Sequence, residues 1–408
     1  MRATAPPLRS RSRHLDASYA WFAGSLGSWV GAAGMQQVLF SWLVIGELRV
    51  GAEWVGTAQM CQSLPAFLFL LVGGVTADRR DPRQLLMLLH VAAGIAAGGM
   101  ALVVGSGSLG LSILLIYALC WGTIQSFAQP ARDALLSEVS GGDLMRAVTA
   151  ATLIQFAAAA LGSGMAGRVA HFSTPGALGV QAGLVLSGLV LMWRLPIRVA
   201  RHPSGLAEST LAAIGDGLRE VWRSPRLRPI GLLVAADGLF YMGPFAVLCP
   251  LMVRDVYHGG VQDLSLIMMA VPIGTICGSG VVLLRGGIRR KGRAFLIALL
   301  GVALCLVTLG AQLPLWGFVA VIFCWGIFHS IFFNTSRTLF QETAPPSHRA
   351  RVLSIHSLGL LGMAPFSNLA AGFLATLVGP LVGCALAGGA MILIVSMTWI
   401  FTNVRHLE

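Results

Sequence analysis

Charged residues are scarce in this chain. Asp, Glu, Lys and Arg make up 11% of its 408 residues, against about a quarter in a typical soluble domain. Hydrophobic residues make up 56%, and the mean hydropathy is +0.78. The net charge of +12 would suggest nucleic-acid binding in a soluble protein. In a chain this apolar we expect an integral membrane protein that contacts the lipid bilayer and binds no nucleic acid.

Clusters of metal-binding or catalytic residues are also missing from the sequence. The seven cysteines all fall within apolar runs, with no spacing typical of a disulfide framework or a zinc site. No loop gathers the His, Asp, Glu or Cys residues that a metal centre or an activated nucleophile requires. We therefore expect no cofactor, no metal and no enzymatic activity. No loop is long enough for the soluble domain that a membrane sensor usually carries.

Long apolar runs fill the rest of the sequence. A helix that spans a membrane needs about 20 mainly apolar residues, so the length accommodates twelve. The runs predict membrane helices near 20–46, 53–77, 83–104, 109–131, 142–170, 174–194, 227–254, 262–285, 292–312, 314–338, 349–378 and 380–402. Because residues 1–18 are basic and polar with no adjoining cleavage signature, the first run is predicted to be a helix rather than a removable signal peptide.

Five segments follow from these helices. They are an N-terminal segment (1–19), a six-helix bundle (20–194), a linker (195–226), a second six-helix bundle (227–402) and a tail (403–408). Within the linker, apolar residues recur at helical spacing among arginines. This pattern predicts a short interfacial helix whose arginines face anionic lipid headgroups.

Basic residues alternate between the two sides of the predicted helices. The side with both termini and the linker holds 25 of the 28 Lys and Arg residues, and the other side holds Arg49, Arg168 and Arg254. The positive-inside rule therefore predicts that both termini are cytoplasmic.

The loop between the second and third predicted helices carries the first motif. It reads Asp78-Arg79-Arg80-Asp81-Pro82-Arg83, with Gly74 one helical turn before Asp78. This spacing resembles the same loop of the major facilitator superfamily, and most of all the branch of drug and siderophore exporters that includes the enterobactin exporter.

A second motif follows the fourth predicted helix and returns about 204 residues later. Gln129-Pro130-Ala131-Arg132 continues to Glu138, and Arg146 follows a short polar turn. In the second half, Cys324-Trp325-Gly326 matches Cys120-Trp121-Gly122. Arg337 matches Arg132, Glu342 matches Glu138, and Arg349 and Arg351 match Arg146. A repeat with an even number of helices leaves the two halves in parallel orientation.

The resemblance implies a fold, a gate and an activity. The fold is an all-α membrane protein of twelve helices in two pseudo-symmetric six-helix bundles around a central cavity. The activity is alternating access, in which the bundles rock about a midplane site. The implied cytoplasmic gate comprises Gly74, Asp78, Arg79, Arg83, Arg132, Glu138, Arg337, Glu342, Arg349 and Arg351.

Small residues in the fifth and eleventh helices form a third motif. Gly162, Gly164 and Gly167 resemble the antiporter motif of the family, with Ser163 where proline is expected; Pro365 and Gly372 stand in the eleventh helix. We expect these residues to allow close packing between helices of the two halves. Dense packing alone explains them equally well.

Two ionisable residues lie deep inside predicted spans. Burial disfavours the charged form of the Asp237 carboxylate, so this group is a candidate carrier of one proton, and His329 is the second candidate. A permanent structural pairing is the alternative for each. Amide side chains within spans are candidates for the cavity lining: Gln36, Gln37, Gln59, Gln62, Gln125, Asn334 and Asn368.

Together these features predict a monomeric exporter of the inner membrane. Its cargo is a small amphipathic molecule, drug-like or siderophore-like, and its coupling ion is the proton. An importer or a lysophospholipid flippase on the same fold remains an alternative. The fourth helix lacks the early arginine of many proton-coupled exporters, which leaves the coupling open.

Overall fold

The computed structural model describes residues 12–140, 144–195, 210–344 and 349–407, with the side chains in these ranges except those of 12–17, 70–79, 144–145, 210–214 and 349–350. Helices dominate these residues, and no strand occurs in them. The N-terminal half contains α1 (Ser12–Trp42), η2 (Leu43–Glu47), α2 (Ala52–Arg79), α3 (Pro82–Gly105), α4 (Leu111–Val139), α5 (Leu144–Phe172) and α6 (Thr174–Trp193). The linker contains α7 (Thr210–Arg223). The C-terminal half contains α8 (Leu227–Phe240), η3 (Pro244–Leu248), α9 (Cys249–Asp255), α10 (Val261–Leu284), α11 (Lys291–Leu309), α12 (Leu315–Thr343), α13 (Arg349–Leu361), α14 (Ala364–Phe401) and η4 (Val404–His406).

The helix ends follow from local sequence. Asp81 caps α3, because its Oδ1 accepts hydrogen bonds from the backbone N–H groups of Arg83 (2.9 Å) and Gln84 (3.4 Å), and Pro82 occupies the first turn. Ser173 caps α6 in the same way through the N–H of Gly176. Inside α14, Gly379 adopts a φ of 81°, which glycine reaches without steric cost. The chain therefore breaks between the eleventh and twelfth predicted spans.

Two predicted spans are interrupted. The seventh consists of α8, the π-helical turn η3 and α9, and η3 begins at Pro244, which has no N–H to donate. The eleventh consists of α13 and the first part of α14, with turns at residues 362 and 363. There Pro365 lacks the N–H that would bond to the carbonyl group four residues earlier. Apolar periodicity does not register such interruptions, because the residues on both sides are equally apolar.

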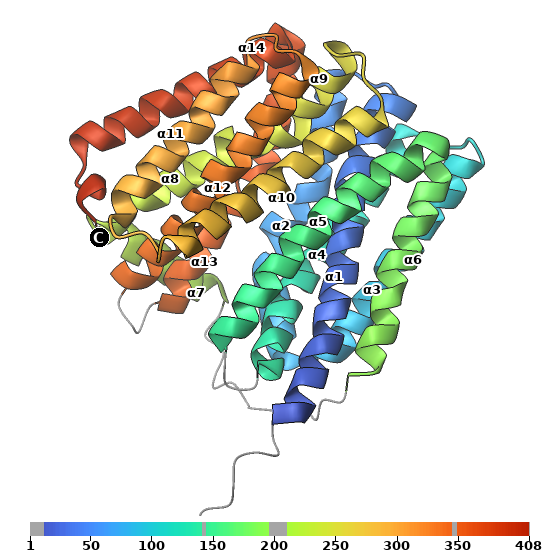
Figure 1. The fold of residues 1–408 in the computed structure, drawn as a ribbon, viewed down its shortest axis with the longest axis horizontal. Helices are drawn as coiled ribbons and strands as arrows, with labels where there is room; N and C mark the ends of the chain where they lie inside the picture. Colours follow the sequence, from blue (N-terminus) through green and yellow to red (C-terminus); the bar gives the residue numbers. More distant parts are fainter. Residues whose placement is uncertain (1–11, 141–143, 196–209, 345–348, 408) are drawn as a thin grey trace, which may run out of the picture.

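Two bundles of helices lie side by side (Figure 1), and the elements given above form six spans in each. In the N-terminal half α1 packs on α5 and α6, and α2 packs on α4; in the C-terminal half α8 packs on α13 and α14, and α10 on α12. A Cβ at Gly122 would lie 2.1 Å from the carbonyl oxygen of Gln62, and one at Gly326 would lie 2.3 Å from that of Val271. The repeat at 204 residues therefore places equivalent close contacts in both halves.

A second equivalent contact confirms the two-fold organisation. Ser163 on α5 donates its hydroxyl hydrogen to the carbonyl oxygen of Gly34 on α1 (3.2 Å). Ser367, 204 residues later, donates to the carbonyl oxygen of Leu239 on α8 (2.5 Å). In each half one serine thus ties the fifth span to the first. The architecture is the expected all-α membrane fold of two pseudo-symmetric six-helix bundles.

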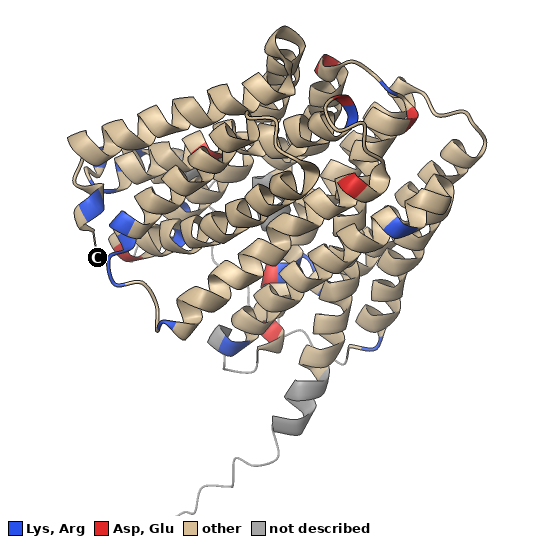
Figure 2. Cartoon of the chain, turned by 45° about the horizontal axis from the view of Figure 1, so that its top comes forward, with Lys and Arg blue, Asp and Glu red and all other residues tan. Residues whose placement is uncertain are grey.

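The two ends of the bundles differ in charge. We call the side that holds the α2–α3 turn, α7 and the C-terminus the terminal side, and the other the opposite side. Figure 2 shows that Lys and Arg lie mainly at helix ends on the terminal side. Helix α7 packs against α13, and Asp216 on α7 pairs with Arg351 at 3.5 Å. Two side chains of α7, Leu218 and Trp222, are about half exposed (52% and 54%), and the guanidinium carbon of Arg228 lies 4.7 Å from the Trp222 ring centroid.

Candidate functional site

The two halves meet along two seams. The first joins α2 to α14. A Cβ at Gly56 would lie 2.7 Å from the carbonyl oxygen of Asn368 and 2.8 Å from the Cα of Gly372, so the backbones touch directly. Across the same seam the Asn368 amide donates to the carbonyl oxygen of Gln59 and to Ser63 Oγ (3.1 Å each). This seam therefore combines glycine packing with a few hydrogen bonds.

The second seam joins α5 to α10. Ser265 on α10 donates its hydroxyl hydrogen to the carbonyl oxygen of Ser163 (2.7 Å). A Cβ at Gly167 would lie 2.2 Å from the Cβ of Ser265, and one at Gly164 would lie 3.0 Å from the sulfur of Met269. The structure thus brings Gly164 and Gly167 to this seam and Gly372 to the first one. Gly162 instead packs against Gly31 within the N-terminal half.

Both seams lie toward the opposite side. Their residues come from the start of α2 and of α10, and from the end of α5. Two contacts extend the junction to the loops there. Thr376 donates to Glu53 Oε2 (3.0 Å), and Arg254 donates to the carbonyl oxygen of Val50 (2.6 Å). The opposite side is therefore held shut by contacts between the halves.

On the terminal side, two of the predicted gate residues, Arg83 and Glu342, bond within their own halves. Arg83 donates to the carbonyl oxygens of Met192 (2.9 Å) and Trp193 (2.6 Å) at the end of α6, in its own half. Glu342 pairs with Lys291 (2.9 Å), also in its own half. Among the ion pairs formed by described residues with one another, none joins the N-terminal half to the C-terminal half.

The remaining gate predictions divide into two groups. Glu138 and Arg337 are exposed, and Arg337 lies within electrostatic range of Asp133 on α4. The surroundings of Gly74 and the side chains of Asp78, Arg79 and Arg349 fall outside the described residues. Asp133 was missed by the sequence reasoning, although its position beside Arg132 in the second motif was a signal for it.

Most of the predicted cavity amides bond within one half. Gln36 Oε1 accepts hydrogen bonds from the Tyr117 hydroxyl (2.5 Å) and from Gln181 Nε2 (2.8 Å). Gln125 Oε1 accepts from the indole N–H of Trp29 (2.9 Å). Asn334 is exposed and donates to the carbonyl oxygen of the residue four positions earlier.

The other amides lie either beside the first seam or at half-buried positions. Gln59 is buried and donates to Ser41 Oγ (3.1 Å), Asn368 lies in the first seam, and Gln37 and Gln62 are half-buried. His90, another polar residue within a span, joins helices of the N-terminal half: its ring lies 2.7 Å from the carbonyl oxygen of Val185 and 3.1 Å from Ser25 Oγ. These contacts hold one bundle together as a unit.

Asp237 has the most unusual environment. It is fully buried on α8 (0% exposed), and neither carboxyl oxygen accepts a hydrogen bond from any described residue. The next residue, Gly238, packs against the carbonyl oxygens of Gly359 and Leu360 on α13, which encloses this turn of α8. His329 on α12 is half-buried, and its ring centroid lies 5.8 Å from that of Phe332.

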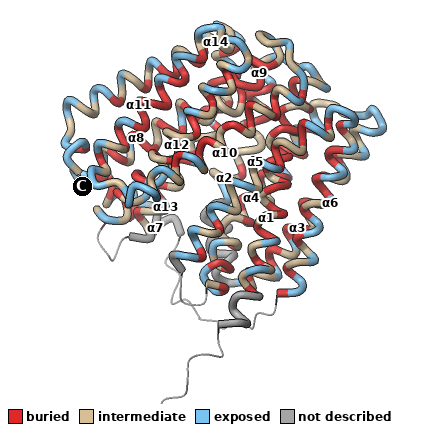
Figure 3. Tube along the Cα trace, viewed as in Figure 1, coloured by how far each residue is buried: buried red, intermediate tan, exposed pale blue. Residues whose placement is uncertain are grey.

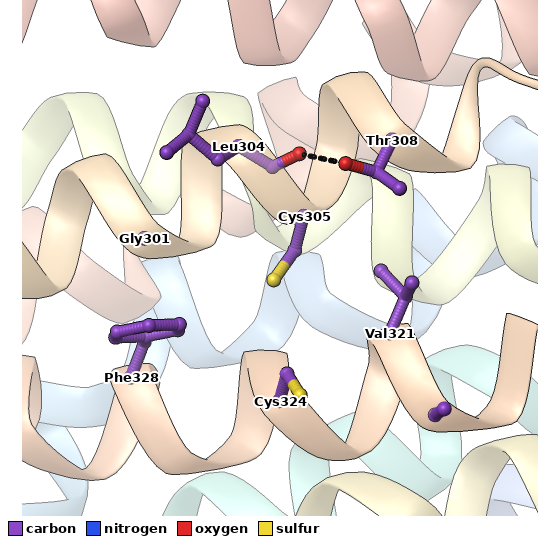
Figure 4. A pocket seen from close by; sticks show the side chains of 8 residues that line it. Gly301, Leu304, Cys305, Thr308, Val321, Cys324 and Phe328 are labelled. Atoms are coloured by element: carbon purple, nitrogen blue, oxygen red, sulfur yellow. Dashed lines mark hydrogen bonds between the residues drawn. The ribbon is translucent and has the colours of Figure 1, made fainter. Parts of the chain in front are cut away.

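One apolar pocket lies away from the seams, between α11 and α12. Its volume is about 260 Å³. Figure 4 shows Cys305 and Cys324 pointing toward its interior and the Thr308 hydroxyl bonded to the carbonyl oxygen of Leu304 (2.8 Å). All its lining residues belong to the C-terminal half, and none is charged. Figure 3 shows that the buried residues instead concentrate where the helices of each bundle face one another.

The family follows from comparison with known proteins. The model of the Major Facilitator Superfamily matches residues 21–365. The chain belongs to this superfamily of membrane transporters, and its parallel halves with matched seams are those of a transporter, not of an enzyme.

Relatives at low sequence identity are also transport proteins. The chain is 26% identical over 360 residues to the multidrug efflux pump Tap of Mycolicibacterium fortuitum, covering 85% of this chain and 86% of that one. It is 24% identical to the staphyloferrin A transporter of Staphylococcus aureus, covering 84% and 85%.

Solved structures share the fold. The nucleoside transporter NupG superposes with a TM-score of 0.73 at 12% identity, covering 95% of this chain and 98% of that one. A bacterial homologue of the human lysosomal transporter Spinster, inward-facing and unoccupied, gives 0.68 at 11% identity, covering 98% and 97%.

Proposed function

We propose that the protein is a secondary active exporter of small amphipathic molecules in the bacterial inner membrane. The observation that carries this proposal is the asymmetry between the two sides: seams of small residues close the opposite side, whereas no ion pair of the described residues joins the halves on the terminal side. Alternating access requires such a difference, which reverses when one half tilts against the other.

The distribution of charge orients this conformation. The predicted spans put 25 of the 28 basic residues on the side of the termini and the linker, and the positive-inside rule makes that side cytoplasmic. The conformation is then closed to the exterior, a state that exporters and importers both adopt in alternating access. An efflux pump and a siderophore transporter among the relatives support export of a drug-like or siderophore-like molecule.

Proton antiport is the coupling that we propose, with Asp237 as the carrier. A carboxylate without hydrogen-bond partners in an apolar interior is costly in its charged form and is stable when it holds a proton. His329 is the second candidate, but it is only half-buried. In this proposal the carrier would alternate between the two sides as the halves tilt.

Vesicle transport tests direction and coupling together. Inside-out vesicles that contain the protein should accumulate ethidium, an amphipathic cationic dye, when their lumen is acidic, and should not do so without a pH gradient. Cells that lack the protein should retain more of its natural cargo in a metabolite screen. Uptake of the screened cargo only into right-side-out vesicles would instead identify an importer. Transport that ignores the pH gradient would reject proton antiport.

The cytoplasmic gate remains a prediction from the first motif. We expect Asp78, Arg79 and Arg83 to contact helix ends of the other half when the terminal side closes. Asp78→Ala should therefore lower transport several-fold by removing a charge-assisted contact of about 1.5–3 kcal/mol, while the amount of protein in the membrane stays unchanged. Asp81→Ala, which removes only the cap of α3, serves as the comparison. Full transport by the Asp78 variant would reject the gate.

A further inference from the structure

Among the residues that the structure describes, no carboxylate forms an ion pair with Arg132 on α4. This arginine lies two residues after Pro130, half-buried, with its guanidinium carbon 5.5 Å from the ring centroid of Trp29 on α1. Its Nη2 donates to Gln129 Oε1 (2.8 Å). Stacking on an indole ring stabilises a cation by about 0.5–2 kcal/mol, which is less than the several kcal/mol that removing an ion from water costs.

The nearest carboxylate does not neutralise this charge by contact. Asp133 lies within electrostatic range of Arg132, but the two form no ion pair. Asp133 accepts instead from Gln129 Nε2 (3.3 and 3.4 Å). A guanidinium group has five N–H donors, and one hydrogen bond from Arg132 to a described residue occupies only one of them.

The surroundings of Arg132 offer further donors. Gln125, Gln129 and Arg132 are spaced by four and three residues, so they share one face of α4. The side-chain oxygen of Gln125 already accepts a hydrogen bond from the indole N–H of Trp29. The NH₂ group of the same amide therefore serves as a donor. Asp133, the residue after Arg132, lies within electrostatic range of Arg337 on α12, so this part of α4 lies near the other half.

We propose that Arg132 and Gln125 form an anion subsite that binds a carboxylate group of the cargo. The planar fork of an arginine matches the two oxygens of a carboxylate, and such hydrogen bonds are stronger than neutral ones. In this conformation Arg132 bonds to no described residue of the other half, so its donors are free for cargo that arrives from the terminal side. The inference rests on the proposed transport function and adds the class of cargo: amphipathic molecules with an acidic group.

Equilibrium binding to a matched pair of probes tests the subsite. The probes are 7-hydroxycoumarin-3-carboxylic acid and its ethyl ester, which differ in the charged group. Binding is followed by fluorescence anisotropy with the full-length protein in nanodiscs of uncharged phosphatidylcholine bilayer. We expect the parent protein to bind the acid at least about tenfold more tightly than the ester, because one charge-assisted bidentate contact contributes a preference of about 10- to 100-fold.

Three variants separate the subsite from general charge and from folding. Arg132→Gln should abolish the preference for the acid, and Arg132→Lys should retain part of it through the remaining charge. Arg289→Gln removes the same charge from an exposed position in the α10–α11 loop and should keep the preference. Equal binding of acid and ester by the parent, no binding of the acid, or an unchanged preference in Arg132→Gln would each overturn the proposal.

A parallel transport measurement keeps the two proposals distinct. If the parent protein exports neither the acid nor ethidium from cells, the proposed export function fails, while the ratio of acid to ester affinities still decides the subsite. If ethidium is exported and the acid shows no preferential binding, the anion subsite alone fails.

Discussion

Replacing Asp237 with Asn should abolish the dependence of transport on a pH gradient while leaving the protein folded. The carboxyl group is fully buried and has no hydrogen-bond partner among the described residues. The amide has nearly the same shape and carries no charge, so the melting temperature should stay the same or rise. A gradient of one pH unit supplies 1.36 kcal/mol per proton. With one coupled proton, the parent should reach a cargo ratio of about tenfold, and Asp237→Asn a ratio near one.

Asp263→Asn is the matched control for this experiment. Asp263 lies in the first turn of α10, where its Oδ2 accepts from the backbone N–H of Gly260 (2.9 Å). Its replacement should cost about 0.5–2 kcal/mol of stability through the weakened cap and should leave the gradient dependence intact. If Asp237→Asn transports cargo with the gradient dependence of the parent, Asp237 is not the proton carrier, and the same measurement on His329→Gln becomes the next test.

Replacing Gly56 with Leu should hold the first seam open and reduce transport to a small fraction of the parent rate. A Cβ at this position would lie within 2.8 Å of backbone atoms of Asn368 and Gly372, which cannot move independently of α14. Overpacking costs about 1–3 kcal/mol, which shifts the ratio of seam-open to seam-closed molecules by about 5- to 150-fold. Because alternating access requires both states, the cycle should stall.

Two measurements check this prediction. In a background without the native cysteines, Ser63→Cys should react faster with a membrane-impermeant maleimide from the opposite side when Gly56→Leu is present. Gly99→Leu is the control, because a Cβ at Gly99 meets nothing within 4 Å and the residue is exposed. Normal transport by Gly56→Leu would show that this seam does not open during the cycle.

The sequence predicts the architecture well because the features that determine it are local. The charged loop at Asp78–Arg83 can be recognised in the sequence without coordinates. The same holds for the repeated Trp-Gly pairs, which contain Gly122 and Gly326. These glycines then make equivalent backbone contacts in the two halves. The breaks near Pro244 and Pro365 are visible as prolines, but whether a proline bends or interrupts a span depends on the helices that pack around it.

It is much harder to predict from the sequence which neighbouring helix each polar side chain contacts. Spans that are apolar on every side carry no periodic signal for which face meets another helix. Gln36, Gln59 and Asn368 therefore look equivalent in the sequence, although the side chains of the two glutamines bond within one bundle and that of Asn368 bonds across to the other half. For the same reason the contact of Arg83 with the end of α6 could not be foreseen, since it depends on the three-dimensional path of the α2–α3 turn.

The second seam has a consequence for the thermodynamics of the cycle. Ser265 bonds across it to a main-chain oxygen of Ser163, whereas the Ser163 hydroxyl serves its own bundle. Opening this seam thus breaks one hydrogen bond worth about 1 kcal/mol and leaves the Ser163 bond inside its own bundle intact. When such small terms distinguish the two conformers, a ligand that prefers one of them by about a thousandfold, roughly 4 kcal/mol, is sufficient to invert their populations. Cargo of modest affinity can then switch the transporter between its two conformations and still dissociate from it.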